Sequence, residues 1–557
     1  MIAKTKFFSN LFSFLFFLFL IIFIVLPLIS FFLTAFSGQP SGIFNIFISK
    51  NYSISLTSSF YSKILTNSYY LKSIYDTIIL ALSVTVLSFI LSLPISYGLA
   101  RTNMPLKSII RVLLGIGISI PGFIVSYDLI IISTNTKLLP FSIYSYSGLL
   151  AVMTLSTIPF MVMYITLAFD NLDYRLIEAA YVNGVSKIKT FFKITLPLLM
   201  PGFVSGWVIV FLLTSGTLSV PLLLAPPTFP IITELAYTQL FSFFNWGTAT
   251  ALLSVLLIIN LIIISTYTLY QKRLSFSTIG GKGFHSKIIT KKWIIALITI
   301  YSFLFAILPI VEVVILGLSS FSSRWVMTPV PTSFTLSNYS QAISLYPFSV
   351  WATLIISISA AILAVAISFI STYFVKTGLI KGKRLIDLLI LVIFSLSSVM
   401  IGLTYLTVFS NPITGFLINS VPIALLIGYV FGRLGYSTRA LDISVNSISK
   451  SLFEAAKIMG KSSFESMRKI IFPLIMPGII EGFLLVFIRS TIDYGSTIML
   501  APYSWFTLAL GSYQFISTGE IAQGAALGFI ILIINIPIMI YLYWRRGKTF
   551  HEQAFLY

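Results

Sequence analysis

The sequence contains no cysteine and only two histidines among its 557 residues. Without cysteine there are no disulfide bonds, thiolate metal sites or cysteine nucleophiles, and two histidines disfavour a histidine-based metal site. Charged residues are also scarce, at 9% against about 25% in soluble domains. Hydrophobic residues make up 57% of the chain and the mean hydropathy is +1.01. These values exclude a soluble enzyme, a disordered chain and a fibrous protein, and they indicate a polytopic membrane protein.

Twelve apolar runs follow one another, each long enough to cross a bilayer as a helix of about 20 residues. Continuously apolar runs favour helices over barrel strands, which alternate apolar and polar residues. We predict an all-α polytopic membrane protein with about 12 transmembrane helices in two parallel six-helix repeats. The predicted spans are 8–36, 73–100, 108–134, 147–169, 197–222, 247–270, 293–318, 347–375, 385–410, 419–437, 473–499 and 520–543.

The net charge of +20 is spread between these runs, which argues against a nucleic-acid partner. If both termini and the loops after even-numbered spans are cytoplasmic, that side holds 29 of the 35 lysines and arginines. The opposite side holds Lys50, Lys63, Lys72, Lys137 and Arg324, and Arg489 lies inside a span. Because cationic loops stay in the cytoplasm, we expect a multi-pass protein of the plasma membrane with both termini cytoplasmic.

An internal repeat appears when the chain is aligned with itself so that Glu178 falls on Glu454. Residues 178–202, EAAYVNGVSKIKTFFKITLPLLMPG, then align with residues 454–478, EAAKIMGKSSFESMRKIIFPLIMPG, and 12 of the 25 positions are identical. We call this shift the repeat offset. Since each copy has an even number of spans, the copies share one orientation and form a parallel repeat. We predict a first six-span unit over 1–270, a cytoplasmic linker over 271–292 and a second unit over 293–557.

The matched segment is polar and lies in a predicted cytoplasmic loop, near 171–196 in the first copy and 442–472 in the second. Its first residues favour a short helix, and the glycine that follows allows a left-handed turn. Prolines then stand where the next span begins, since a first-turn proline needs no N–H partner, and a second proline adds a deformable point. The residues are Glu178, Ala179, Ala180, Gly184, Pro197 and Pro201, and in the second copy Glu454, Ala455, Ala456, Gly460, Pro473 and Pro477.

This motif resembles the Glu-Ala-Ala loop of permeases in ATP-binding-cassette importers, and the wider chain resembles the fused two-unit permeases for iron(III), thiamine, polyamines and phosphonates. Segments that support this subgroup are Asn338-Tyr339 after PTSFTLS, VPLLLAPP at 220–227, and Asp493-Tyr494-Gly495 followed by STIML. Phe472 departs from the leucine that the family has before the proline. The alternative is that each loop merely links two spans.

The resemblance implies that each loop is a coupling helix docked on a separate ATPase subunit. Glu178 and Glu454 would contact the ATPase, while Gly184 and Gly460 would shape the turn. The implied partners are two ABC ATPase subunits, an extracytoplasmic solute-binding protein and the lipid bilayer. We expect no catalytic residue, metal or cofactor on this chain, because no complete phosphate-binding loop is present.

Charges inside the predicted spans are few. Arg489 and Asp493 stand four residues apart, which places them on one face of a helix. Each charge is costly at mid-bilayer, so they either pair or line the substrate pathway, and we favour an ion pair that fixes the packing of spans.

We therefore predict an ATP-driven importer permease that carries a small solute, with iron(III) first and thiamine, a polyamine or a phosphonate as alternatives. An ion-coupled secondary transporter also often has 12 spans and parallel halves. It would need intramembrane acids as ion relays, and it would leave the paired loops without a purpose. A membrane-embedded enzyme would need clustered catalytic side chains, which do not converge in this sequence.

Overall fold

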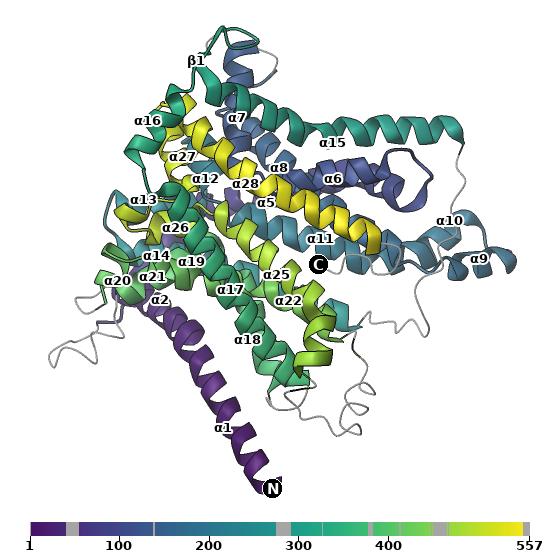
Figure 1. Cartoon of the computed structure of the whole chain (residues 1–557), viewed down its shortest axis with the longest axis horizontal. Helices are drawn as coiled ribbons and strands as arrows, with labels where there is room; N and C mark the ends of the chain where they lie inside the picture. The colour runs from purple at the N-terminus through teal and green to yellow at the C-terminus, as the bar shows by residue number, and fades with distance from the viewer. Residues whose placement is uncertain are drawn as a thin grey trace.

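The structure is a computed structural model. It describes residues 2–40, 55–136, 140–273, 291–325, 327–376, 382–410, 414–446, 448, 465 and 467–549. Helices α1 to α14 form the first half of the molecule, and α15 to α28 form the second (Figure 1). The protein is an all-α polytopic membrane protein, with one short hairpin of strands β1 (Ser322–Arg324) and β2 (Ser333–Phe334) among the described residues.

The first half begins with a long helix interrupted by one π-helical turn and ends with the helix before residue 274. Its elements are α1 (Ile2–Leu20), η1 (Ile21–Val25), α2 (Leu26–Ser37), α4 (Ser59–Thr66), α5 (Ser68–Arg101), α6 (Lys107–Ile118), α7 (Gly122–Thr136), α8 (Tyr146–Asp170), α9 (Tyr174–Val182), α10 (Lys187–Thr190), η2 (Phe191–Thr195), α11 (Leu196–Ser215), α12 (Ser219–Leu224), α13 (Ile232–Phe241) and α14 (Trp246–Arg273).

The second half repeats this order. Its helices are α15 (Lys292–Phe321), α16 (Ser337–Leu345), α17 (Ser349–Lys376), α18 (Lys383–Ser395), α19 (Ser398–Phe409), α20 (Phe416–Asn419), α21 (Ile423–Gly432), α22 (Leu434–Asn446), η3 (Met467–Ile471), α25 (Phe472–Thr491), α26 (Gly495–Leu500), η4 (Tyr503–Trp505), α27 (Leu508–Ser517) and α28 (Ile521–Thr549).

The two halves keep the repeat offset in their secondary structure. The elements η2, α11, α12 and α13 correspond to η3, α25, α26 and α27, with both ends of each element displaced by that offset. A tertiary hydrogen bond repeats as well. Thr77 Oγ1 accepts the backbone N–H of Ile232 at 3.0 Å, and Thr353 Oγ1 accepts that of Leu508 at 2.8 Å. The duplication therefore preserved individual contacts, in addition to the order of helices.

Several predicted spans are broken in the structure. Among the described residues, nine helices are long and apolar enough to cross a membrane, and eleven spans result if two bent pairs count as one each. Spans 108–134 and 385–410 are these pairs, α6 with α7 and α18 with α19, bent by 99° and 107°. The predicted span 419–437 corresponds to the short helix α21 and the start of α22. The predicted fold of about 12 transmembrane helices in two repeats is confirmed, but these three predicted spans are not single continuous helices.

The spans predicted for 197–222 and 473–499 also stop early. Helix α11 ends at Ser215 and α25 at Thr491, and each is followed after three residues by a separate short helix, α12 or α26. We refer to the non-helical residues at 216–218 and 492–494 as the break segments. Non-helical backbone at membrane depth is tolerated only where protein partners or water satisfy its polar groups.

The first span of each half packs against the other half. Helix α2 contacts α19, and α15 contacts α5 and α6. Tyr405 donates its hydroxyl to the carbonyl of Phe23 at 2.7 Å, in the π-helical turn η1. Tyr301 of α15 donates to the carbonyl of Leu91 in α5 at 3.1 Å. This reciprocal exchange fastens the two halves together (Figure 1).

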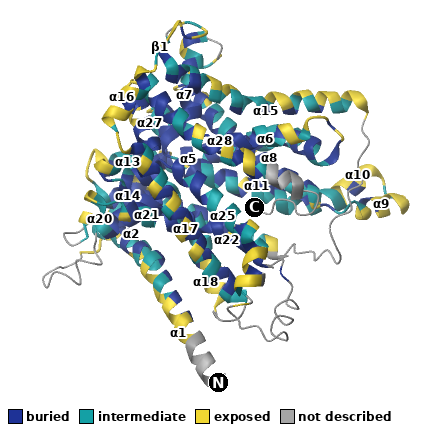
Figure 2. Cartoon of the chain, viewed as in Figure 1, coloured by how far each residue is buried: buried dark blue, intermediate teal, exposed yellow. Residues whose placement is uncertain are grey.

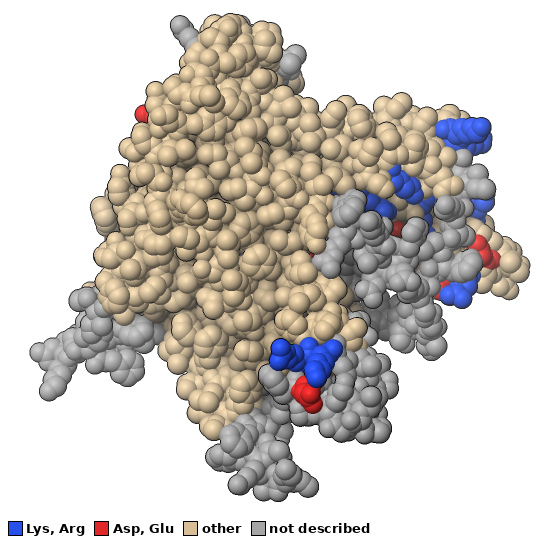
Figure 3. Space-filling model, in the orientation of Figure 1, with Lys and Arg blue, Asp and Glu red and all other residues tan. Residues whose placement is uncertain are grey.

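Charge and burial define the membrane-facing body. Charged side chains seen in Figure 3 gather toward the ends of α9, α10 and α15 and near the lower ends of α18 and α22, while the broad remaining surface in that view carries almost none. Figure 2 shows buried residues concentrated in the middle of the bundle, around α5 and toward α14. Long apolar helices such as α15 expose residues including Ile300 and Leu304, as lipid contact requires.

The repeated threonine bond is open to a direct test. Thr77→Val and Thr353→Val each leave a buried backbone N–H without its acceptor, so each is expected to lower the free energy of unfolding by about 1–3 kcal/mol. Thr85→Val is the matched control, because Thr85 is buried on the same helix and its hydroxyl bonds only Ala81 of its own turn in the structure. Thermal unfolding in detergent measures the difference. Equal midpoints for Thr77→Val and Thr85→Val would contradict the assigned role.

Candidate functional site

The first Glu-Ala-Ala segment is a capped helix, α9, that lies outside the bundle of spans (Figure 1). Asp173 caps its start, where the carboxylate accepts the backbone N–H of Arg175 at 3.0 Å. Gly184 follows the helix with φ +74°, the left-handed conformation that the sequence predicts. The N–H groups of Gly184 and Val185 bond the carbonyls of Tyr181 and Ala180, both at 3.0 Å. This pattern is a Schellman motif, and a glycine suits its left-handed position.

Helix α9 presents an unusual mixture of side chains to solvent. Ile177 and Ala180 are buried against the rest of the chain, whereas Glu178 and Ala179 are exposed. Val182 is 88% exposed and Ile188, just beyond the turn, is 74% exposed. The loop therefore carries a carboxylate flanked by uncovered apolar groups, which is the composition of a protein-binding surface.

The loop continues into the next span without a helical interruption. The helix runs from Lys187 to Ser215, through α10, the π-helical turn η2 and α11. Pro197 lies in the first turn of α11, as predicted, but the chain before it is already helical. A proline inside a helix removes a hydrogen bond and crowds the preceding turn, and the widened π turn fits that defect. Pro201 lies inside α11.

The second copy repeats this passage as far as the structure describes it. The π-helical turn η3 precedes α25, with Pro473 in the first turn and Pro477 inside the helix. Most of the predicted loop, with Glu454, Ala455, Ala456 and Gly460, lies outside the described residues. The roles predicted for these four residues stay predictions.

The glycine after the second proline faces a neighbouring helix in both halves. A Cβ at Gly202 would clash with Ala168 of α8, and a Cβ at Gly478 would clash with Ser444 of α22. The two pairs are equivalent under the repeat offset. Glycine is therefore needed because two helices approach closely beside each loop.

A cation at the end of each second span binds the helix that leads into the loop. Arg101, the last residue of α5, donates to the carbonyls of Phe169 and Leu172, the latter at 3.2 Å. Lys376, the last residue of α17, donates to the carbonyls of Val445 and Ile448, the latter at 2.8 Å. The accepting carbonyls are again equivalent under the repeat offset. We call these two arrangements the cation clasps.

The clasps satisfy a known deficit of helix ends. The last four carbonyls of a helix have no partner within it, and a cation near them is also favoured by the helix dipole. Arg101 is only 3% exposed, and its guanidinium lies 4.6 Å from the ring centre of Tyr174, the first residue of α9. Arg101 thus joins α5, the end of α8 and the start of α9. Sequence reasoning missed both clasps, although each cation stands at a span end.

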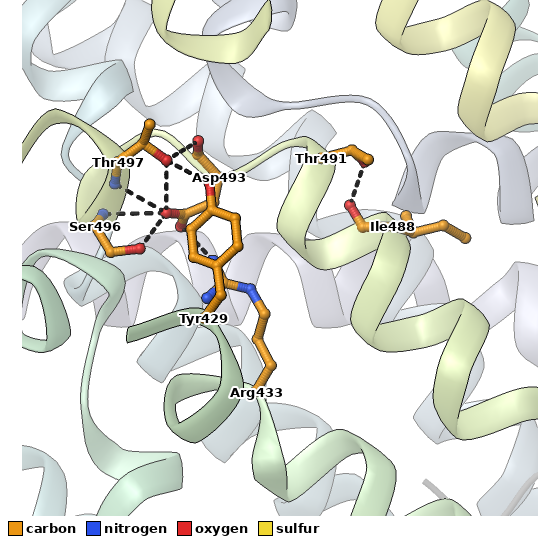
Figure 4. Close-up of polar contacts among 7 residues, drawn as sticks. All are labelled: Tyr429, Arg433, Ile488, Thr491, Asp493, Ser496 and Thr497. Carbon is orange, nitrogen blue, oxygen red and sulfur yellow. Dashed lines mark hydrogen bonds and ion pairs between the residues drawn. The ribbon is translucent and has the colours of Figure 1, made fainter. Parts of the chain in front are cut away.

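The predicted ion pair between Arg489 and Asp493 is wrong in its partner. Asp493 is paired with Arg433, with the two side-chain atoms 2.9 Å apart and both side chains buried (Figure 4). Because α25 ends at Thr491, Asp493 lies in the break segment and not one turn further along the helix. Arg433 lies between α21 and α22, although the charge count assigned it to a cytoplasmic loop. The pair therefore joins the junction of α21 and α22 to the break segment after α25.

Asp493 also caps the short helix α26. Its carboxylate accepts the backbone N–H of Ser496 at 3.1 Å and that of Thr497 at 3.2 Å. The guanidinium of Arg433 lies 4.1 Å from the ring centre of Tyr429, and the hydroxyls of Tyr429 and Thr497 are 2.6 Å apart. Figure 4 shows these groups gathered around the carboxylate. The charge of Asp493 is neutralised and its hydrogen bonds are satisfied within one buried cluster.

Arg489 has a different environment, between the two halves. Its guanidinium lies 5.7 Å from the ring centre of Phe160 in α8 of the first half. It lies 5.6 Å from the ring centre of Tyr436 in α22 of the second half. The side chain is partly buried.

A comparison with known families decides what this architecture belongs to. The family model for the inner membrane component of binding-protein-dependent transport systems matches residues 91–276 and 380–546, together more than half of the chain. The chain belongs to this family of transport permeases. The two matched segments each contain one Glu-Ala-Ala loop, so the permease carries the family domain in two copies.

Individual relatives are distant. A ferric transport system permease protein of Actinobacillus pleuropneumoniae is 23% identical over 426 residues, which cover 73% of this chain and 59% of the relative. A probable sulfate transport system permease protein of Prototheca wickerhamii is 28% identical over 36% of this chain and 80% of its own length. A putative 2-aminoethylphosphonate transport system permease protein of Salmonella typhi is 23% identical over 43% of this chain and 90% of its own length. The permease thus spans about three fifths of the ferric relative.

The Arg433–Asp493 pair predicts a specific pattern of stabilities. Arg433→Met or Asp493→Leu leaves one buried charge uncompensated and is expected to cost about 3–5 kcal/mol, whereas the double variant costs less than either single change. Arg489→Met is the matched control, because it removes an arginine of neighbouring depth that the structure does not pair with Asp493. Thermal unfolding of the purified permease measures all four. A loss for Arg489→Met equal to that for Arg433→Met would restore the partner predicted from sequence.

Proposed function

We propose that this permease forms the translocation path of an ATP-driven importer for a small solute. The assembly comprises one copy of this chain, two ABC ATPase subunits and an extracytoplasmic solute-binding protein. ATP is hydrolysed on the ATPases, and this chain supplies movement and not chemistry. The membrane is the plasma membrane, and both termini are cytoplasmic.

The observation that best supports this function is the structure of the first loop. Helix α9 offers Glu178 beside exposed Val182, and the helix that starts at Lys187 continues as a span to Ser215. Apolar side chains as exposed as these gain free energy when a partner buries them, and a carboxylate supplies a directional contact. A push on this loop reaches the bundle because the following helix is continuous. The charge distribution supports a cytoplasmic position, since most of the lysines and arginines fall on that side even when the buried Arg433 is left out.

Iron(III) is the first candidate solute, because two ferric transport permeases are relatives over 73% and 64% of this chain. Sulfate and 2-aminoethylphosphonate permeases align over shorter segments. Thiamine and polyamines remain alternative solutes, because the sequence resemblance includes permeases for them. An ion-coupled secondary transporter is not favoured, because membership of the permease family and the paired loops both point to external ATPases.

The coupling role can be tested on the two glutamates. Glu178→Gln combined with Glu454→Gln is expected to lower solute-stimulated ATP turnover by roughly tenfold or more, because both contacts to the ATPases are lost. The measurement uses the permease reconstituted with its ATPases and binding protein. Glu465→Gln is the control, since Glu465 is an exposed acid 3.3 Å from Lys469. Wild-type turnover in the double variant would refute the role.

The cation clasps give a second test of force transmission. Arg101→Met with Lys376→Met is expected to leave ATPase binding intact while the ratio of solute transported to ATP hydrolysed falls about tenfold. The reason is that the ends of α8 and α22 that lead into the loops then lose their charge-assisted hydrogen bonds to α5 and α17. Arg101→Lys is the control, because the second half already uses lysine. If the double methionine variant keeps the wild-type ratio, the clasps have no part in coupling.

A further inference from the structure

Phe160 and Tyr436 occupy equivalent positions in the two halves, because the repeat offset places one on the other in the aligned helices α8 and α22. The midpoint between two equivalent groups lies on the axis that relates them. The guanidinium of Arg489 is 5.7 Å from one ring centre and 5.6 Å from the other. It therefore lies within 5.7 Å of that midpoint, and so beside the pseudo-twofold axis of the permease.

A second arginine lies nearer the end of the bundle that carries the loops. Arg439 is three residues beyond Tyr436 on α22 and is exposed. It interacts electrostatically with Tyr164 of α8 and Tyr267 of α14, both from the first half. Guanidinium groups thus occur at two successive depths between the halves, accompanied by tyrosine hydroxyls. These are hydrogen-bond donors of the kind that bind oxyanions.

Among the residues that the structure describes, Arg489 forms no ion pair with an acid. Asp493 is neutralised by Arg433. Glu481 precedes Arg489 by eight residues on α25, about 12 Å along the helix. Asp442 is six residues from Tyr436 on α22, about 9 Å along the helix. Glu312 lines a small cavity together with Pro159. Successive side chains leave a helix about 100° apart, so this cavity lies on a different face of α8 from Phe160.

We propose that Arg489 is a solute-binding residue on the axial path and that the solute crosses as an anion. This inference rests on the proposed importer function and narrows its substrate class. Two aromatic rings offset only part of the cost of a guanidinium at membrane depth that has no acidic partner among the described residues, so an anionic group that visits this position accounts for its place beside the axis. The first-half equivalent is Leu213, so the duplication places no second arginine at the depth of Arg489. Bare iron(III), thiamine and polyamine cations are disfavoured, whereas an oxyanion or an anionic ferric chelate fits.

The absence of cysteine allows a test without any partner protein. Phe160→Cys places the one thiol of the full chain beside Arg489, and its modification rates by an anionic and a cationic methanethiosulfonate reagent are compared. At about 6 Å across water, one charge changes the ratio of the two rates by about tenfold. We expect that ratio to favour the anionic reagent and to fall about tenfold when Arg489→Gln is added. Val182→Cys, on the exposed loop, is the control whose ratio stays constant.

A thiol at position 160 that does not react would show that the axial position is closed to solutes, and an unchanged ratio would show that Arg489 exerts no field there. Either result overturns the proposal. Arg489→Lys keeps the charge and is expected to keep the ratio, which separates the effect of charge from a folding defect.

Transport assays give the second arm. The permease is reconstituted with its ATPases and binding protein, and uptake of sulfate, inorganic phosphate and ferric citrate is compared with that of thiamine and spermidine. We expect ATP-dependent uptake of an anion, reduced roughly ten- to hundredfold by Arg489→Gln and unaffected by Arg384→Gln on α18.

Sulfate or phosphate uptake identifies a free oxyanion, and ferric citrate uptake identifies a chelate. Uptake confined to thiamine or spermidine, or full anion uptake by Arg489→Gln, overturns the proposal. Failure of the binding protein to stimulate ATP turnover would instead count against the importer function.

Discussion

The structure depends on one constraint, that polar backbone groups at membrane depth find partners within the protein. Helices α11 and α25 both stop partway, which frees backbone groups in the break segments. Side chains then take over. Thr233 donates to the carbonyl of Thr217, Ser215 donates to Asn260, and Thr491 donates to Asn535. The first of these bonds satisfies a backbone carbonyl of a break segment directly, and the other two hold the ends of α11 and α25 against neighbouring helices.

Both halves keep side-chain contacts that satisfy backbone groups, but the two halves differ in their buried charges. The threonine bonds and the cation clasps recur in both halves, because each meets a backbone need that both copies inherit. The second half has Arg433 where the first has Thr157, and Asp493 where it has Thr217. Helix α8 is continuous at that point, whereas α21 and α22 are separate helices joined at Arg433. The ion pair therefore accompanies an additional break, and its charges compensate each other where lipid would penalise either alone.

The two-unit architecture and the Glu-Ala-Ala loops could be predicted from sequence, because identical residues at a fixed shift report duplication directly. The left-handed Gly184 followed from its position after a helix-forming segment. The bends at Pro121 and Leu396 could not be predicted, since apolar residues continue across them. The partner of Asp493 was wrong for the same reason, because helical spacing to Arg489 holds only if the helix continues. The cation clasps join residues far apart in the chain, and spacing along one helix does not reveal them.

The places where the two halves touch closely indicate how the halves can move relative to each other. At the breaks the halves touch closely, since Asn260 donates to the carbonyl of Ser395 at 3.2 Å and Gly216 leaves no room for a Cβ beside Ser397. Figure 1 shows the helices converging around α12, α19 and α26 and diverging toward α9 in one half and α18 in the other. A rotation about the break region therefore displaces the loop ends most. The clasp at Arg101 ties the start of α9 to α5 and α8, and α8 carries Phe160 beside Arg489, so under the proposed function a displacement at α9 is passed to the space beside Arg489.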